Sequence, residues 1–153
     1  MKKLLLLTAA LGLTGLGVAR VISNVYDLRF VRADANSDSS VSLDEFITSQ
    51  TGLTRVVDAK HRFNLADTDA SGGLSITEFR NSRGGVKGGR AVRYEAFQLA
   101  DANHDGFLTL QEYADTEPKN RAGRLLANTF ARRDKDSDGK LSLREFGVLV
   151  IPR

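Results

Sequence analysis

The residues that could do chemistry in this chain form a run of twelve, residues 134–145, in which carboxylates recur at alternate positions. The carboxylates at positions 1, 3, 5 and 12 are Asp134, Asp136, Asp138 and Glu145. A hard cation such as calcium takes about six to eight oxygen ligands at ~2.3–2.6 Å. Three alternating side chains, the backbone carbonyl of Lys140 at position 7, and a final glutamate that offers two oxygens would supply such a set. The run therefore predicts a calcium site.

The same spacing occurs three more times, and the four runs start 33, 34 and 33 residues apart. We number these loops one (34–45), two (67–78), three (101–112) and four (134–145). The predicted ligands of loop one are Asp34, Asn36, Asp38, the carbonyl of Ser40, and Glu45. Those of loop two are Asp67, Asp69, Ser71, the carbonyl of Gly73, and Glu78. Those of loop three are Asp101, Asn103, Asp105, the carbonyl of Phe107, and Glu112.

Each loop needs an element on either side to hold it, and aromatic residues mark these elements. A phenylalanine lies four residues before every loop, and an aromatic follows every terminal glutamate. The eight flanking aromatics are Phe30, Phe46, Phe63, Phe79, Phe97, Tyr113, Phe130 and Phe146. A fixed period of this length is typical of a repeat architecture. We expect helix–loop–helix units whose aromatics build the core.

These loops resemble the EF-hand loops of the calmodulin family, in which glycine at position 6 permits the sharp turn. The resemblance covers residues 22 to about 150. It implies an all-α fold with two lobes, each a pair of EF-hand units whose loops are joined by a short β bridge. It also implies that the position-8 residues meet in these bridges, Val41 opposite Leu74 and Leu108 opposite Leu141. Up to four calcium ions are expected as cofactors.

The four sites are not equal in sequence. Loop four has four ligand carboxylates and is expected to bind most strongly, and loop three differs from it by a neutral Asn103. Loop two is less charged, with Ser71 at position 5. In loop one Ser39 replaces the turn glycine, and a left-handed non-glycine residue costs ~1–2 kcal/mol. Loop one is therefore predicted to be the weakest site.

Residues 1–19 resemble a secretory signal peptide, with Lys2 and Lys3 before an apolar run and small residues at 17–19. This predicts a secreted or periplasmic protein that begins at Arg20. The apolar run of 16 residues is short for a membrane span, which needs ~20. The alternative is a protein tethered to a membrane by an uncleaved N-terminal segment.

The mature chain is expected to divide into an N-terminal pair at 20–82, a linker at 83–90 rich in glycine and basic residues, and a C-terminal pair at 91–153. The expected entering helices are 22–33, a helix that ends at Ala66 with Thr54 as its N-cap, 91–100 and 121–133. Exit helices follow each loop: the second is expected to be short, and the fourth to span 143–151. His61 and His104 are expected on the surface.

The composition of the chain excludes several classes of function. Of the 19 Asp and Glu residues, 13 lie at predicted ligand positions, and no cysteine is present for disulfides, thiolate sites or thiol catalysis. No nucleophile–base arrangement is evident, so we do not expect an enzyme. The predicted function is a calcium buffer or a calcium-stabilised scaffold. The alternative is a sensor that exposes a groove for a partner protein, or that binds an anionic membrane or polymer. Nucleic acid is not an expected partner.

Overall fold

The computed structural model describes residues 24–50, 54–82, 84, 89–121 and 123–149. The predicted signal peptide, most of the predicted linker, and the last residues of the predicted fourth exit helix lie outside this part of the chain. None of the described helices is long and apolar enough to cross a membrane.

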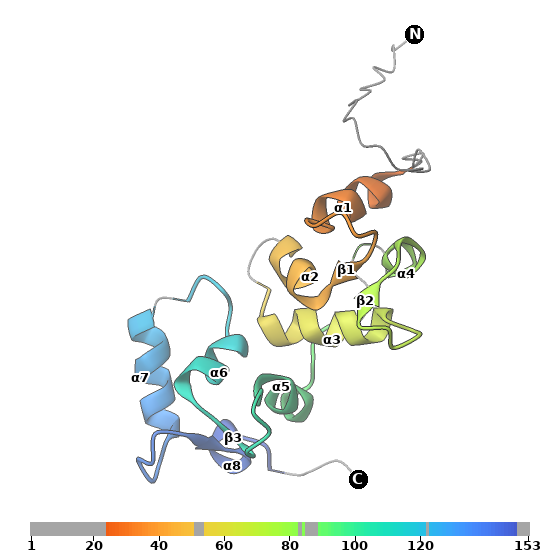
Figure 1. The fold of residues 1–153 in the computed structure, drawn as a ribbon. Coiled ribbons are helices and arrows are strands. Elements are labelled where there is room, and N and C mark those ends of the chain that lie inside the picture. Colours follow the sequence, from red (N-terminus) through yellow and green to blue (C-terminus); the bar gives the residue numbers. More distant parts are fainter. Residues whose placement is uncertain (1–23, 51–53, 83, 85–88, 122, 150–153) are drawn as a thin grey trace.

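The described chain is mostly helical, and its helices alternate with four two-residue strands (Figure 1). The first half contains α1 (Val25–Ala33), β1 (Val41–Ser42), α2 (Leu43–Ser49), α3 (Val56–Ala66), β2 (Gly73–Leu74) and α4 (Ile76–Asn81). The second half contains α5 (Arg93–Ala100), β3 (Phe107–Leu108), α6 (Leu110–Asp115), α7 (Gly123–Arg133), β4 (Leu141–Ser142) and α8 (Leu143–Phe146). Each loop thus lies between two helices, which confirms the predicted all-α fold.

Two antiparallel bridges join the loops in pairs. Val41 pairs with Leu74 across β1 and β2, and Leu108 pairs with Leu141 across β3 and β4. All four of these side chains are fully buried. The predicted register is confirmed, and the apolar residue at position 8 fixes each loop to both its partner and the core.

The flanking aromatics build two cores, as predicted. The first core contains Phe30, Phe46, Phe63 and Phe79, and the second contains Phe97, Tyr113, Phe130 and Phe146. Their rings meet edge to face, for example at 5.5 Å between the centroids of Phe30 and Phe79. Such pairs contribute about 0.5–1.5 kcal/mol beyond the area that they bury.

Helix α3 contacts both cores. Ala59 and Phe63 pack in the first core, whereas Val57 is fully buried in the second. Figure 1 shows α3 crossing beside α5, between the two groups of helices. The two halves of the chain are therefore packed against each other through α3, although the predicted domain boundaries themselves remain a prediction.

Polar contacts reinforce this packing. Asp58 accepts hydrogen bonds from the Arg55 guanidinium at 2.8 and 2.6 Å and from the Ala91 N–H at 3.0 Å. Lys60 Nζ donates to the Leu99 carbonyl at 2.9 Å. Arg55 also forms an isolated antiparallel bridge with Pro118. We call Arg55, Asp58 and Ala91 the α3 latch.

Three local predictions were wrong. The N-cap of α3 is Arg55 rather than Thr54, and it makes no side-chain cap. Helix α8 ends at Phe146, where Gly147 adopts a left-handed φ of 95° and its N–H donates to the carbonyls of Leu143 and Arg144. Leu149 therefore lies beyond the helix and is 87% exposed. His61 is largely buried between the halves, with Nδ1 2.5 Å from Glu95 Oε1.

Candidate metal centres

All four loops have the same backbone turns. The residue at position 6 is left-handed in each: Ser39, Gly72, Gly106 and Gly139, with φ of 73, 81, 82 and 82°. The residue at position 4 is also left-handed: Ser37, Ala70, His104 and Ser137, with φ of 55 to 62°. The strain predicted for Ser39 is therefore present, since serine there adopts the conformation that glycine adopts in the other three loops. The position-4 turns were not foreseen from the sequence.

The aspartate at position 1 closes each loop. Its carboxylate accepts a hydrogen bond from the position-6 N–H in all four loops: at 3.1 Å for Asp34, 2.9 Å for Asp67, and 3.0 Å for both Asp101 and Asp134. The side chains at position 3 accept from the position-5 N–H at 2.9–3.3 Å, at Asn36, Asp69, Asn103 and Asp136. The predicted ligand side chains are thereby drawn toward the inside of each turn.

The glutamate at position 12 is held in the same way in every loop. One of its carboxylate oxygens accepts hydrogen bonds from the backbone N–H and the side-chain hydroxyl of the residue at position 9. The residue at position 9 is the N-cap of the exit helix, and the two residues together form a capping box. The other oxygen reaches across the loop to the N–H at position 2, at 3.0 Å for Glu45, 2.9 Å for Glu78, 3.1 Å for Glu112 and 2.8 Å for Glu145. The exit helix is therefore tied to the start of its loop.

The four capping residues were missed as a group, although the signal was in the sequence. They are Ser42, Ser75, Thr109 and Ser142, and each precedes its glutamate by three residues. Serine or threonine followed three residues later by glutamate is the sequence signature of a capping box. These hydroxyls position the carboxylates that are predicted to bind the metal.

Hydrogen bonding keeps the position-12 glutamates ionised. The N–H and hydroxyl of Ser75 lower the pKa of Glu78 to about 2, and the hydroxyl and N–H of Ser142 lower the pKa of Glu145 to about 2. The same kinds of donor hold the pKa of Glu45 below its usual value. These carboxylates are anionic at neutral pH, and a carboxyl group binds calcium in this ionised form.

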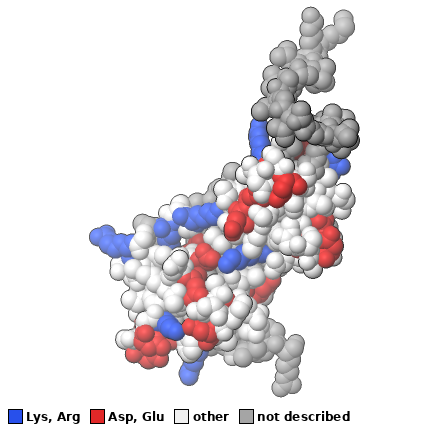
Figure 2. Space-filling view, viewed as in Figure 1, with Lys and Arg blue, Asp and Glu red and all other residues white. Residues whose placement is uncertain are grey.

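Carboxylates converge most closely in loops two and four. Oxygens of Asp67, Asp69 and Glu78 lie within 4.8 Å of one another, as do oxygens of Asp134, Asp136 and Asp138. Figure 2 shows acidic surface at the lower left and at the right edge, near the positions of loops four and two in Figure 1. Three like charges at this separation repel one another, and a divalent cation between them removes the repulsion.

One buried oxygen in loop four fits a cation directly. Asp134 Oδ1 is buried and has no hydrogen-bond partner among the described residues. A buried carboxylate oxygen without a partner is unfavourable unless a cation binds it. The donors brought together here are all oxygens, which suits calcium. The residues present therefore fit the ion, with the side chains at positions 1, 3, 5 and 12 of each loop and the carbonyl at position 7 as its predicted ligands.

Two contacts would compete with the ion. In loop two, Ser71 Oγ donates to the Gly73 carbonyl at 2.9 Å, so two predicted ligands are bonded to each other. In loop three, Lys140 of loop four lies 2.8 Å from Asp105 Oδ2. This ammonium group, together with the Phe107 N–H, holds the pKa of Asp105 below its usual value. Neither contact was predicted from the spacing alone.

The two loops of the first pair, loops one and two, also contact each other. Ser40 and Gly73 hold position 7 in loops one and two, and a Cβ added at Gly73 would collide with Ser40 Oγ. Glycine at this position therefore lets the two loops approach in the β1–β2 bridge. This explains why loop two has a second glycine directly after its turn glycine.

Comparison of the chain with known proteins finds a family that it matches. The chain matches the EF hand family over residues 59–81, 94–115 and 126–150, ranges that include loops two, three and four. Calcineurin B of Schizosaccharomyces pombe is 29% identical over 133 residues, which cover 80% of this chain and 76% of the relative. Calcineurin B type 2 of Bos taurus is 29% identical over 133 residues, covering 80% of this chain and 78% of the relative.

Solved structures give a looser match. Caltubin from the great pond snail aligns with 23% identity and a TM-score of 0.38, covering 83% of this chain and 95% of caltubin. A homolog of programmed cell death 6 protein from Leishmania major Friedlin aligns with 14% identity and a TM-score of 0.37, covering 81% of this chain and 69% of that chain.

Proposed function

Since the chain is an EF-hand calcium-binding protein, we propose that it holds calcium as a buffer or as a calcium-stabilised scaffold, and that its lobes do not open on binding. A sensor of this family responds to calcium by separating its helices and exposing an apolar groove. The proposal places this chain in the class whose helices barely move.

One observation carries the proposal: each position-12 glutamate already spans its loop. The glutamate is the ligand that connects the exit helix to the ion, so movement of the exit helix requires movement of this carboxylate. Here all four carboxylates bond to the N–H at position 2, at 2.8–3.1 Å. Calcium would replace hydrogen bonds inside a loop that is already closed, with little change in the angle between helices.

The packing of α3 supports the same proposal. Val57 is fully buried in the second core, and the α3 latch joins α3 to Ala91. Because α3 leads into loop two, rotating it to open the first core would also pull Val57 out of the second. Opening would therefore cost packing in both halves of the chain.

We propose an exported setting, because residues 1–19 resemble a signal peptide. Calcium sites of extracellular modules need dissociation constants of only ~10⁻⁴–10⁻³ M. A protein in such a setting would be permanently loaded, and calcium present at about 100 times its dissociation constant would add ~2.7 kcal/mol of stability. Mass spectrometry of the protein exported by its own cells tests this, with Arg20 as the expected first residue.

The proposal is tested by the fluorescence of an apolar-surface dye during a calcium titration, with magnesium as the control. We expect the dye signal to stay flat or fall while calorimetry of the same sample records binding. A calcium-specific rise in fluorescence would contradict the proposal, because it would mean that an apolar groove becomes exposed.

A partner-binding role is the second candidate, and α1 is the observation that favours it. Val25, Leu28 and Val31 are 54, 43 and 46% exposed along this helix. The two relatives named above are subunits of calcineurin, and any subunit of an assembly contacts other chains. Under this function a partner protein would cover α1.

The net charge of the chain favours a variant of this partner-binding role, in which the partner is an anionic surface. Removing residues 1–19 takes away two lysines, so the formal charge falls from +3 to +1, and four calcium ions would raise it to +9. A calcium-dependent attraction to an anionic membrane or polymer would follow. Co-sedimentation with anionic vesicles tests this variant, and equal binding with calcium and with a chelator would rule it out.

We also infer that the chain is not an enzyme. Of the 19 carboxylates that could serve as acid and base, 13 stand at the predicted ligand positions of the four loops. A carboxylate bound to calcium is not available to accept a proton. Calcium chemistry, rather than proton transfer, is therefore the use that these side chains fit.

A further inference from the structure

A cavity of about 550 Å³ lies between α1, the end of α2, α3 and α4, and none of the described residues that line it belongs to a calcium loop. Its volume falls within the range of ~300–1,000 Å³ that is usual for small-molecule sites. The described residues that line it are Arg29, Arg32, Ala33, Ser49, Gln50, Thr54, Arg62, Phe79 and Gly84. We call it the arginine cavity.

The described lining is basic. It contains three arginines from two helices, Arg29 and Arg32 on α1 and Arg62 on α3, and no aspartate or glutamate. Its remaining polar residues, Ser49, Gln50 and Thr54, carry hydroxyl and amide groups that can donate hydrogen bonds. Like charges gathered around one cavity repel one another unless an anion lies among them. The cavity therefore favours an anionic occupant.

The arginines are positioned by local contacts. Arg62 Nε donates to the Asp58 carbonyl at 3.0 Å, which anchors the base of its guanidinium on α3. Gly84 has a left-handed φ of 66°, and a Cβ there would lie 3.4 Å from Arg29 Cδ and 3.5 Å from Phe79 Cε1. The left-handed φ favours glycine here, and the chain after α4 lies against the stem of Arg29. These contacts hold the stems of Arg29 and Arg62 at the cavity.

The end of α2 does not oppose an anion strongly, although the C-terminus of a helix is normally its negative end. The Phe46 carbonyl accepts from Ser49 Oγ at 2.7 Å, and the Ile47 carbonyl accepts from Lys119 Nζ at 2.8 Å. The lysine brings a positive charge to this helix end. The partial negative charge of α2 is therefore compensated next to the cavity.

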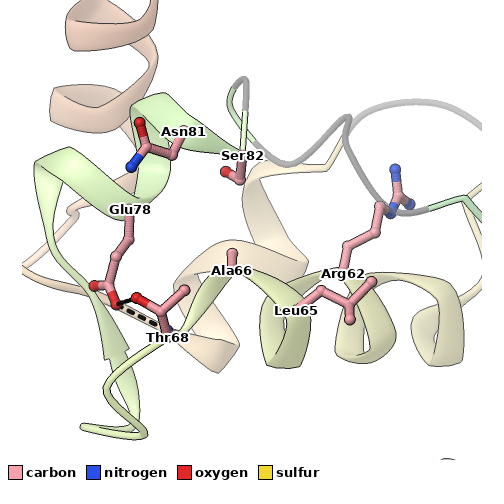
Figure 3. Close-up of a pocket in the computed structure, with 7 residues that line it drawn as sticks. All are labelled: Arg62, Leu65, Ala66, Thr68, Glu78, Asn81 and Ser82. Atoms are coloured by element: carbon pink, nitrogen blue, oxygen red, sulfur yellow. Dashed lines mark hydrogen bonds between the residues drawn. The ribbon is translucent and has the colours of Figure 1, made fainter.

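Apolar surface adjoins the arginines. Phe79 and Ala33 line the cavity and belong to the first core. Arg62 also lines a neighbouring pocket of about 270 Å³, with Leu65 and Ala66 beside it (Figure 3). In Figure 3 Arg62 lies on the opposite side of this pocket from Glu78, which is hydrogen-bonded to Thr68. An occupant that joins an anionic group to an apolar group would fit both surfaces.

We propose that the arginine cavity binds a phosphate-bearing organic molecule, with the phosphate among the guanidinium groups of Arg29, Arg32 and Arg62. A guanidinium group presents a planar fork of donors that matches phosphate oxygens, and such charged pairs are about twice as strong as neutral hydrogen bonds. A phosphomonoester could reach the cavity as a soluble molecule or as a lipid headgroup. The site is separate from the calcium loops, so it does not depend on the proposed buffer function.

Calorimetry with phenyl phosphate tests the proposal on the full chain, in calcium and in a chelator. We expect binding in at least one of these conditions, and at least a tenfold loss of affinity in the Arg29→Gln/Arg32→Gln variant. Both arginines are exposed, so the variant should fold. The single variant Arg32→Gln provides a second test with less change to α1. Retained calcium binding would show that the variants are folded.

The matched control is Arg124→Gln/Arg132→Gln, which removes the same charge from exposed positions on α7. Phenyl phosphate should bind this control as it binds the unchanged protein. If phenyl phosphate does not bind at all, or if both double variants lose affinity equally, the proposal is wrong. Benzyl alcohol, which is uncharged, should not bind.

The two sources of phosphate are separated by vesicles of phosphatidylcholine that contain phosphatidic acid. If the vesicles displace phenyl phosphate from the unchanged protein, the occupant is a lipid headgroup. If phenyl phosphate binds but the vesicles do not displace it, the occupant is a soluble phosphomonoester. Either result supports the site, since both require phenyl phosphate to bind through the α1 arginines.

Discussion

At the scale of single residues, the four loops differ at only a few positions, and these set how well each can hold calcium. The backbone turns at positions 4 and 6 are shared, as are the hydrogen bonds that the carboxylates at positions 1 and 12 accept. Differences in affinity should therefore arise from the neutral residues at position 3 of loops one and three, from Ser39 in loop one, from Ser71 in loop two, and from the contact between Lys140 and Asp105.

Replacing Ser39 with glycine should tighten loop one. Ser39 has a φ of 73°, a conformation that costs a non-glycine residue ~1–2 kcal/mol. Glycine removes this cost of holding the loop in its binding conformation, so the affinity of one site should rise by about 5- to 30-fold. Calorimetric calcium titration measures the change. Ser40→Gly is the control, since Ser40 is not left-handed, and an equal gain in both variants would contradict the explanation.

Replacing Lys140 with glutamine should strengthen loop three. Lys140 Nζ lies 2.8 Å from Asp105 Oδ2, and calcium must compete with this ammonium group for the carboxylate. Because the lysine side chain is 43% exposed, water and salt screen this contact, and the gain in affinity should be small. This gain is measured as the change in the calcium affinity of loop three at low salt. Lys135→Gln removes a loop-four lysine that is not bonded to Asp105 and should leave loop three unchanged.

At the scale of elements, α3 does more than the repeat pattern predicts. Its period places Ala59 and Phe63 in the first core, but Val57 lies in the second. The α3 latch and the Lys60 contacts with Leu99 and Asp115 hold it against the second half of the chain. The sequence predicted the helix and its end at Ala66. It could not predict these contacts, since they join residues 33 to 55 positions apart.

The α3 latch should make the protein sensitive to acid. Burial raises the pKa of Asp58, but hydrogen bonds and charge from Arg55, with the Ala91 N–H, outweigh it and hold the pKa below its usual value. A carboxyl group with a lowered folded pKa adds stability above its unfolded pKa of ~3.9, and this stability is lost as the pH falls through the folded pKa. Asp58→Asn should remove about 1.5–3 kcal/mol at neutral pH.

The contribution of Asp58 to stability is measured by urea unfolding of the unchanged protein and of Asp58→Asn, from pH 7 down to pH 3 and in the presence of a chelator. The difference in free energy of unfolding between the unchanged protein and Asp58→Asn should be largest at neutral pH and should shrink below about pH 4. The comparison cancels the titration of the calcium ligands, which are present in both proteins. A difference that stays constant with pH would contradict the ionised state of Asp58.

At the scale of the whole molecule, most of the fold followed from the repeat. The period and the flanking aromatics predicted the loops and both cores, the resemblance to EF-hand loops implied the register of both bridges, and all of these are confirmed. The sequence did not predict how the two halves meet. The sequence predicted only a linker at 83–90, whereas the halves are held by side chains of α3 that carry no sequence signature of their own.

The contacts of α3 predict cooperative unfolding. Because Val57 is buried in the second core while Phe63 is buried in the first, neither core can lose α3 without disturbing the other. We expect a single thermal transition for the calcium-free protein in scanning calorimetry, with equal calorimetric and van't Hoff enthalpies. Two resolved transitions would mean that the halves fold independently.

The central claim is that four preformed loops bind calcium, with loop one the weakest, and the stoichiometry of binding tests it most directly. A calorimetric calcium titration of the chain, freed of calcium beforehand, should reach four ions per chain, with one ion binding only after the other three. Two ions or fewer per chain would contradict the account, since it would mean that the shared geometry of the loops does not make them sites.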